Sequence, residues 1–175
     1  LGSGADRHLV RAVGHLDLAV LRHSLECLVA HHESLRTTFA VVDGRPLQVV
    51  SPLGAVSLPV TDLRPIGPEV ERLAAARLAL AREAERPFDL ARGPLLRVAV
   101  LQVADDTRLV CVTMHHLIAD AWSVDIFVRE LVARYRDGIG GRMLRLPAPE
   151  LQYADFAEWQ RGQYEGERRA SLVSY

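Results

Sequence analysis

The sequence predicts an α/β fold, arranged as an α+β two-layer sandwich in which a mixed sheet is flanked by helices. Apolar runs typical of strands alternate along the chain with helical patterns, which favours this architecture over a helix bundle or a β-sandwich. One run, residues 109–112, is apolar on both faces, as expected of a central strand. The 175 residues, 49% hydrophobic and 25% charged, suffice for one domain with a hydrophobic core.

The first part of the chain is expected to form a strand, a helix and a hairpin. Residues 8–13 have the length and composition of a short strand. Asp17 is typical of a helix N-cap, and apolar residues follow it at helical spacing, namely Leu18, Leu21, Leu25, Leu28 and Val29. Asp43-Gly44 separates two apolar runs, 36–42 and 46–50, and this dipeptide is the strongest short-range signal for a hairpin.

The middle of the chain is expected to form an edge strand, a loop and a second helix. Residues 51–67 contain several prolines around the short apolar run 56–60, which suits a strand at a sheet edge. Pro68 suits the first position of a helix that runs to about residue 86. The helix dipole favours the charged residues at the two ends of this helix, namely Glu69, Glu71 and Arg86.

The second half is expected to contain two more strands and two more helices. The strands cover residues 95–103 and 108–114 and are joined by a turn at Asp105-Asp106. A helix over residues 122–135 is predicted from apolar positions at helical spacing: Val124, Phe127, Val128, Leu131, Val132 and Tyr135. A last helix is predicted over residues 153–169.

Composition and charge exclude several functions. The 21 basic residues, all arginine, balance 22 acidic ones, which leaves no positive field for nucleic acid. No run reaches the ~18 apolar residues that span a bilayer, and the first residues lack the apolar segment of a signal peptide. Cys27 and Cys111 are expected to be small buried thiols in a reducing compartment. We therefore expect a cytoplasmic protein with no membrane or nucleic-acid partner.

The candidate catalytic side chains His115, His116 and Asp120 lie in residues 114–123, where the buried strand is expected to end and a helix to begin. Ligands of α/β folds tend to bind at such junctions. Adjacent residues of a strand point to opposite faces, so His115 and His116 are expected to diverge, one toward the protein and one toward a substrate. That geometry and the lack of a completing Cys or Glu cluster argue against a metal ion here.

Chemistry alone leaves two interpretations of this segment open. Both histidines could be structural, with Asp120 only capping the helix. Alternatively, one imidazole acts as a general base, which is the commonest catalytic role of histidine near neutral pH. In that case Asp120 would hold the loop through hydrogen bonds or an ion pair.

The segment resembles the HHxxxDG signature of condensation domains of nonribosomal peptide synthetases. Three further stretches resemble motifs of this family in the same order: residues 32–39 resemble RHExLRTxF, residues 87–97 resemble PFDLxxGPLLR, and residues 153–161 resemble YxDYAxWQ. A single HHxxxD match could arise by chance. Four ordered matches, from about residue 33 to residue 161, are a much more specific signal.

The resemblance implies a fold, a reaction and a set of partners. Residues 1–175 would be the N-terminal lobe of a domain with two lobes, each resembling chloramphenicol acetyltransferase, and the second lobe would be absent. The reaction is amide formation between a donor acyl or peptidyl thioester and the amine of an acceptor aminoacyl thioester. Phosphopantetheine arms on upstream and downstream peptidyl carrier proteins would bring both, next to adjacent synthetase domains, with no cofactor bound directly. The lobe alone is expected to be nearly inactive and to form a homodimer through its exposed apolar surface.

The resemblance also implies roles for individual residues. His116, the second histidine of the motif, would orient or deprotonate the attacking amine and could stabilise the tetrahedral intermediate. His115 and Asp120 would support the site. We hypothesise that Arg36 donates a charge-assisted hydrogen bond to Asp120. The candidates for the channel wall are the next three residues, Ala121, Trp122 and Ser123, although Ser123 is better explained as a helix cap.

Two residues depart from the family's motifs. Ala121 stands where the family has glycine, which would cost about 1 kcal/mol if the position required a positive φ. His31 stands where the RHExLRTxF motif has its arginine. The remaining aromatic and aliphatic motif residues are expected to pack in the core or on a helix face: Phe88, Leu90, Leu95, Tyr153 and Trp159.

Two other functions remain compatible with the motifs. One is an O-acyltransferase of the same HxxxD superfamily that uses coenzyme A or a carrier. The other is a docking domain without catalysis. The Trp-Ser that follows Asp120 and the Thr-Thr-Phe that follows Arg36 favour the amide-forming enzyme.

Overall fold

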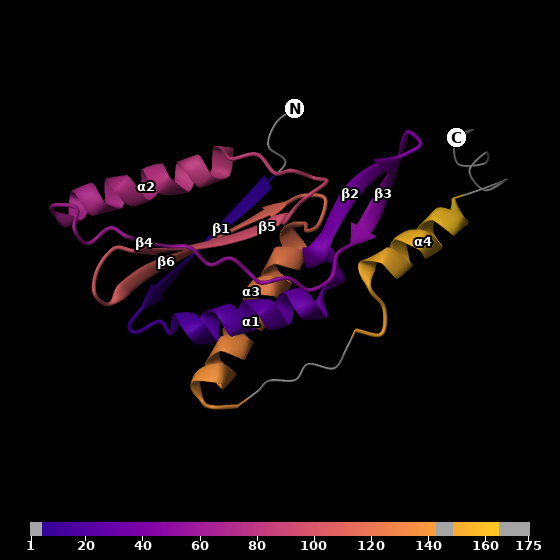
Figure 1. Ribbon diagram of the computed structural model, residues 1–175. Coiled ribbons are helices and arrows are strands. Elements are labelled where there is room, and N and C mark those ends of the chain that lie inside the picture. Colours follow the sequence, from indigo (N-terminus) through magenta and orange to yellow (C-terminus); the bar gives the residue numbers. More distant parts are fainter. Residues whose placement is uncertain (1–4, 143–148, 165–175) are drawn as a thin grey trace.

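The main sheet of the protein has four strands. The computed structural model describes residues 5–142 and 149–164. The strands lie in the order β1-β6-β5-β4 (Figure 1) and are β1 (Ala5–Val13), β6 (Thr107–His115), β5 (Leu96–Gln102) and β4 (Val60–Asp62). β6 is antiparallel to both β1 and β5, whereas β4 is parallel to β5. The sheet is therefore mixed, and β6 is an inner strand, as its apolar run predicted.

Helices cover both faces of this sheet (Figure 1). On one face, Val98 of β5 and Val112 of β6 share a core with α1 (Leu18–His31) and α3 (Ala121–Ile139). On the other face, the alternate residues Leu101 and Leu109 share a smaller core with Ala76 of α2 (Glu69–Glu85). The predicted fold class, a mixed sheet flanked by helices, is confirmed. Among the residues described, no helix is both long and apolar enough to cross a membrane.

The predicted hairpin forms a separate two-stranded sheet. It consists of β2 (Thr37–Val42) and β3 (Arg45–Val50), and the 3-10 helix η1 (Glu33–Arg36) precedes it. At its turn Asp43 and Gly44 have φ values of 51° and 74°, both in the left-handed region that two-residue hairpin turns require. The Asp-Gly signal therefore predicted both the hairpin and its turn.

α1 and α3, the two helices that share the larger core, pack closely near the start of α1. Asp17 caps α1 as predicted, and its own N–H donates to the hydroxyl of Tyr135 on α3 (2.9 Å). Nearby, a Cβ on Gly138 of α3 would lie 2.7 Å from Cγ1 of Val20 on α1. Glycine suits this position because a side chain there would require Val20 to move.

Several boundaries differ from the predicted ones because pairing and capping act beyond the local pattern. β1 begins at Ala5, since its pairing with β6 continues to the Ala5–His115 pair. Pro68 is the N-cap of α2 rather than its first residue, and Arg86 is its C-cap. α3 continues past Tyr135 to Ile139, and the predicted strand at 56–60 forms instead as β4. α4 covers Tyr153–Gln163, and the predicted continuation to residue 169 lies outside the described residues.

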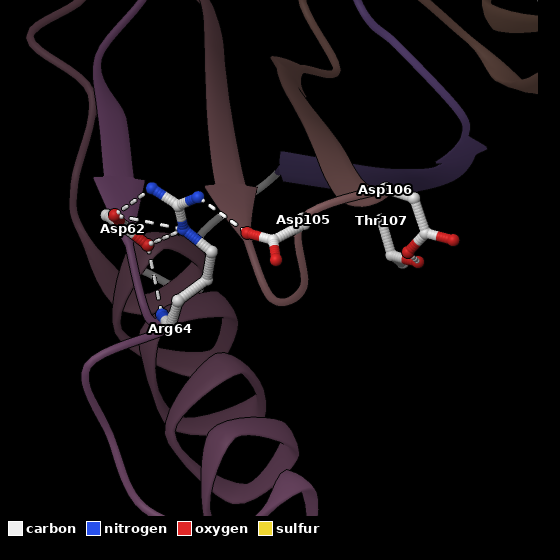
Figure 2. A network of polar contacts seen from close by, with 5 residues as sticks. All are labelled: Asp62, Arg64, Asp105, Asp106 and Thr107. Atoms are coloured by element: carbon white, nitrogen blue, oxygen red, sulfur yellow. Dashed lines mark hydrogen bonds and ion pairs between the residues drawn. The ribbon is translucent and has the colours of Figure 1, made fainter.

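An exposed network of charges joins β4 to the turn between β5 and β6 (Figure 2). The guanidinium of Arg64 donates to both carboxylate oxygens of Asp62 and to Asp105 (Nη1–Oδ1 2.8 Å). Hydrogen bonds from Arg64 lower the pKa of Asp62 to about 2. In the same turn the Thr107 hydroxyl donates to Asp106 (3.0 Å). The pair between Arg64 and Asp105 thus links the end of the short edge strand β4 to the turn between β5 and β6.

Candidate active site

The candidate site lies where the inner strand β6 gives way to α3. β6 ends at His115, and the N–H of Ile118 donates to the carbonyl of His115 (3.0 Å), which closes a tight turn. α3 then begins at Ala121. His116 and Leu117 lie at the tip of this turn, and both are exposed. A buried strand and a capped helix therefore hold His116 from both sides.

His115 is turned back toward the protein. Its Nδ1 accepts a hydrogen bond from the N–H of Leu117 (3.2 Å), and its ring meets the ring of Phe88 edge to face at 5.8 Å. Burial is the main cause that lowers the pKa of His115, and the neighbouring charge of His116 lowers it further. His115 is therefore held neutral near physiological pH, with Nδ1 as an acceptor.

Phe88 is itself fixed by an arginine. The guanidinium of Arg97 lies over the Phe88 ring, 3.7 Å from its centre, and is bound by the carboxylate of Glu83. Arg97 also donates to the carbonyls of Glu83 (3.0 Å) and Arg86 (2.9 Å). This contact series from α2 through Phe88 holds His115 in place.

His116 points the other way, into an open cleft of about 260 Å³. The apolar part of the cleft is formed by Leu35, Met114, Ile118 and Phe127. Its polar residues include His32, Asp120 and Ser123. The two adjacent imidazoles thus diverge as expected, although His116 lies in the turn after β6 rather than on the strand, and only His116 borders the cleft.

Asp120 caps the helix beside His116. Its carboxylate accepts from the N–H of Ser123 (2.8 Å) and from the Ser123 hydroxyl (2.6 Å). These hydrogen bonds, the hydroxyl first, lower the pKa of Asp120, so the carboxylate is charged near neutral pH. The N-cap of α3 is therefore Asp120 and not Ser123, the residue that the sequence suggested for this role. Ser123 is the hydrogen-bond partner of Asp120 and also lines the cleft.

The hypothesised hydrogen bond between Arg36 and Asp120 is wrong for this structure. Arg36 donates to the carbonyl of Ser51 (2.7 Å) and to the carboxylate of Glu33 (3.0 Å). Its side chain borders a second cavity, of about 480 Å³, that is lined partly by residues of β5. The physical reason is that both residues have closer partners. In η1, Glu33 lies one turn from Arg36 and accepts its hydrogen bond. In α3, Ser123 lies one turn from Asp120 and donates to its carboxylate.

The other two channel candidates do not line the cleft. Ala121 is the first residue of α3 and is exposed. Because Ala121 has helical backbone rather than a positive φ, alanine in place of the family's glycine carries no backbone strain here. Trp122 is exposed by 74%. Their part in a channel wall stays a prediction.

Three residues of the cleft were missed from sequence: His32, Ser34 and Tyr153. His32 and Ser34 belong to the RHExLRTxF-like segment, and Tyr153 opens the YxDYAxWQ-like segment, so the ordered motifs were the available signal. Gln152 brings these segments together, because its side chain accepts from the N–H of Glu33 (3.1 Å) and donates to the carbonyl of His31 (3.0 Å).

The packing expected of α4 is wrong within the described residues. Tyr153 and Trp159 are exposed by 58% and 60%, and Phe156 lies between them with ring centres 6.1 and 5.8 Å away. The reason is that α4 extends from the body of the protein and contacts it mainly through η1 (Figure 1). Its aromatic residues therefore form an open stripe.

The remaining predicted packing residues behave differently from one another. Leu95 is completely buried, Phe88 packs against the main core, and Leu90 is exposed. Both cysteines are reduced, with Cys111 buried and Cys27 partly buried. Leu95 and Cys111 thus follow the sequence-based expectation, and Leu90 does not.

Comparison with known proteins identifies the family. The family model described as Condensation domain matches residues 6–175. The chain therefore belongs to the condensation-domain family.

Curated relatives are much longer than this chain. A component of the linear gramicidin synthase of Brevibacillus parabrevis is 43% identical over 166 residues, which are 95% of this chain but 2% of that protein. Phosphinothricin tripeptide synthetase PhsB of Streptomyces viridochromogenes is 47% identical over 158 residues, which are 90% of this chain and 13% of that protein.

Solved structures share the fold. SgcC5 protein from Streptomyces globisporus matches with a TM-score of 0.80 and 29% identity, over 97% of this chain and 38% of that one. The starter condensation domain of rhizomide synthetase RzmA matches with a TM-score of 0.85 and 21% identity, over 97% of this chain and 40% of that one. The second likeness concerns the fold alone.

Proposed function

We propose that the chain takes part in forming amide bonds between two carrier-bound partners in nonribosomal peptide biosynthesis. The single observation that carries the proposal is the exposed imidazole of His116 in an open cleft, at the rigid junction of β6 and α3. The names of its relatives, a linear gramicidin synthase and a tripeptide synthetase, support peptide products. The reaction class is acyl transfer to an amine.

The reaction joins the acceptor's amine nitrogen to the donor's thioester carbonyl. The new C–N bond forms as the amine attacks, and the C–S bond breaks when the tetrahedral intermediate collapses. The proton lost by the amine passes to the thiolate that leaves. The imidazole of His116 orients the amine and carries this proton. Asp120, charged and bound to Ser123, holds the start of α3 beside His116 and takes no proton itself.

We propose further that residues 1–175 form the N-terminal lobe of a two-lobed domain. The chain covers only 38% and 40% of the two solved relatives, which supports a second lobe outside it. That lobe would close the cleft, and phosphopantetheine arms of the upstream and downstream carrier proteins would deliver both thioesters as substrates. The chain would need no cofactor of its own. Without that lobe we expect little activity and self-association through the aromatic stripe of α4.

The test restores the complete domain with both carrier proteins and measures the dipeptidyl product on the downstream carrier. We expect His116→Ala to lower the rate by about 10²- to 10⁴-fold, the contribution typical of general acid–base catalysis. His23→Ala serves as the matched control, because His23 is an exposed histidine of α1 outside the residues that line the cleft. Equal product from the parent and His116→Ala would remove the catalytic assignment.

A further inference from the structure

A second group of potential ligands lies beside the cleft, where α1 ends. His31 is the last residue of α1, His32 is its C-cap, and Glu130 lies in the middle of α3. One donor atom from each lies within 4.8 Å of the other two. His32 Nε2 and Glu130 Oε2 are already in contact at 2.8 Å, and all three side chains are partly exposed.

Two consecutive histidines can converge here because the helix ends between them. His31 has helical backbone, whereas His32 has an extended conformation with φ −107° and ψ 108°. This change of backbone brings the two rings into edge-to-face contact, with centres 4.7 Å apart. The alternation that separates adjacent side chains on a strand therefore does not apply at this position.

We propose that His31, His32 and Glu130 bind a divalent transition metal ion of the Zn²⁺ class. Two imidazole nitrogens and one carboxylate oxygen are ligands that Zn²⁺ prefers, and three protein ligands leave a fourth position for water. The ion would replace the direct contact between His32 and Glu130 and join the end of α1 to α3. This site is separate from the proposed amide-forming chemistry, although His32 also borders the cleft.

The charges around the cluster favour a transition metal over Ca²⁺ or Mg²⁺. Glu130 contributes one negative charge, while Arg134, one turn further along α3, acts on His31 with a positive charge. Glu130 supplies the only carboxylate among the three proposed ligands, whereas a hard cation needs several oxygen ligands. Affinity must come from direct coordination by nitrogen, which imidazole provides for Zn²⁺, Ni²⁺ or Cu²⁺.

The site is a property of this chain rather than of the motif. His31 stands where the RHExLRTxF motif has arginine, and an arginine there would remove a ligand and add a positive charge. His31→Arg is therefore the decisive variant, because it restores the motif and leaves the contact between His32 and Glu130 in place.

The test titrates Zn²⁺ into the untagged protein by isothermal calorimetry and records the visible spectrum of the Co²⁺ form. The background carries Cys27→Ser, because Cys27 Sγ lies 3.6 Å from His23 Nε2 and the two could bind Zn²⁺ themselves. We expect one ion per chain and a higher melting temperature with Zn²⁺, since a ligand that binds only the folded state stabilises it.

Three variants and one control decide the outcome. His31→Arg, His32→Ala and Glu130→Gln should each weaken Zn²⁺ binding by at least about tenfold, because loss of even an outer-shell partner costs 10- to 100-fold. His15→Ala removes an exposed histidine elsewhere and should bind as the parent does. The proposal is overturned if the Cys27→Ser protein takes up no Zn²⁺, or if folded His31→Arg binds it with parental affinity.

Discussion

The chain contains two His-His pairs, and they behave in opposite ways. At the end of β6, His115 packs toward Phe88 while His116 faces the cleft. At the end of α1, the rings of His31 and His32 touch each other and lie next to Glu130. The same dipeptide therefore provides a single exposed imidazole where a strand ends and a convergent pair of potential ligands where a helix ends.

The difference teaches that backbone conformation, not composition, decides what a histidine pair can do. At the end of β6, the strand gives way to a tight turn between His115 and His116, and the contact of Phe88 with Arg97 holds His115 on its side. At the helix end, the change to extended backbone at His32 reverses the separation. A proton-transfer role needs one accessible ring, whereas metal binding needs two rings that meet.

Of the changes that test how the two histidine pairs differ, removal of the Phe88 ring is expected to have the largest effect on stability and on the orientation of His115. Phe88→Ala should lower the free energy of unfolding by about 2 kcal/mol, less than for a fully buried phenylalanine because the ring is only partly buried. His115 should then lose its fixed orientation. Urea denaturation measures the stability, and the histidine ring signals in an NMR spectrum report the orientation. Phe88→Leu, which keeps apolar volume but no aromatic face, should cost about 1 kcal/mol.

If Phe88→Ala changed neither stability nor the His115 signals, the contact with Phe88 would not explain why the two rings diverge. The backbone alone would then set their directions.

A smaller effect is expected from the titration of His115. Its pKa in the folded protein is below the usual 6.5, mainly because of burial, so the unfolded chain binds the proton more readily. The free energy of unfolding should therefore be unaffected above about pH 7 and decrease as the pH falls through 6.5 and below. His115→Asn keeps an acceptor for the Leu117 N–H and should lose less stability between pH 7.5 and pH 5.5.

Denaturation curves of the parent and His115→Asn at several pH values provide the measurement. Parallel pH profiles would show that His115 is as easily protonated in the folded state as in the unfolded chain.

The smallest effect is expected far from both pairs, in the exposed network of Figure 2. Arg64→Ala removes the contacts with Asp62 and Asp105 and should lower the melting temperature less than either change above, because water and salt screen exposed charges. The difference from the parent should shrink in about 1 M salt. It should also shrink as the pH falls from about 4 toward 2, where Asp62 is protonated. A difference that salt leaves unchanged would indicate packing rather than charge.

Sequence predicted the parts of the fold that depend on neighbours along the chain. Asp17 caps α1 and Asp43-Gly44 forms the hairpin turn because both act within a few residues. The apolar run 109–112 of β6 predicted an inner strand, because a strand buried on both faces is mostly apolar. Strand alternation predicted that His115 and His116 diverge, although the structure separates the two rings by ending β6 at His115 and placing His116 in the turn that follows.

Features that depend on distant segments were missed. Arg36 was expected to reach Asp120, but closer partners were available to both residues. His32 and Glu130 are 98 positions apart, and only the packing of α1 against α3 brings them together. The aromatic residues of α4 could not be assigned from helical spacing, because burial depends on what packs against that helix.

The close approach of Gly138 to Val20 restricts how this protein can diverge in evolution. A Cβ at position 138 would lie 2.7 Å from Cγ1 of Val20, so a larger residue there requires the Val20 side chain to move or to become smaller. Substitutions of Gly138 should therefore be tolerated better when position 20 carries a smaller residue.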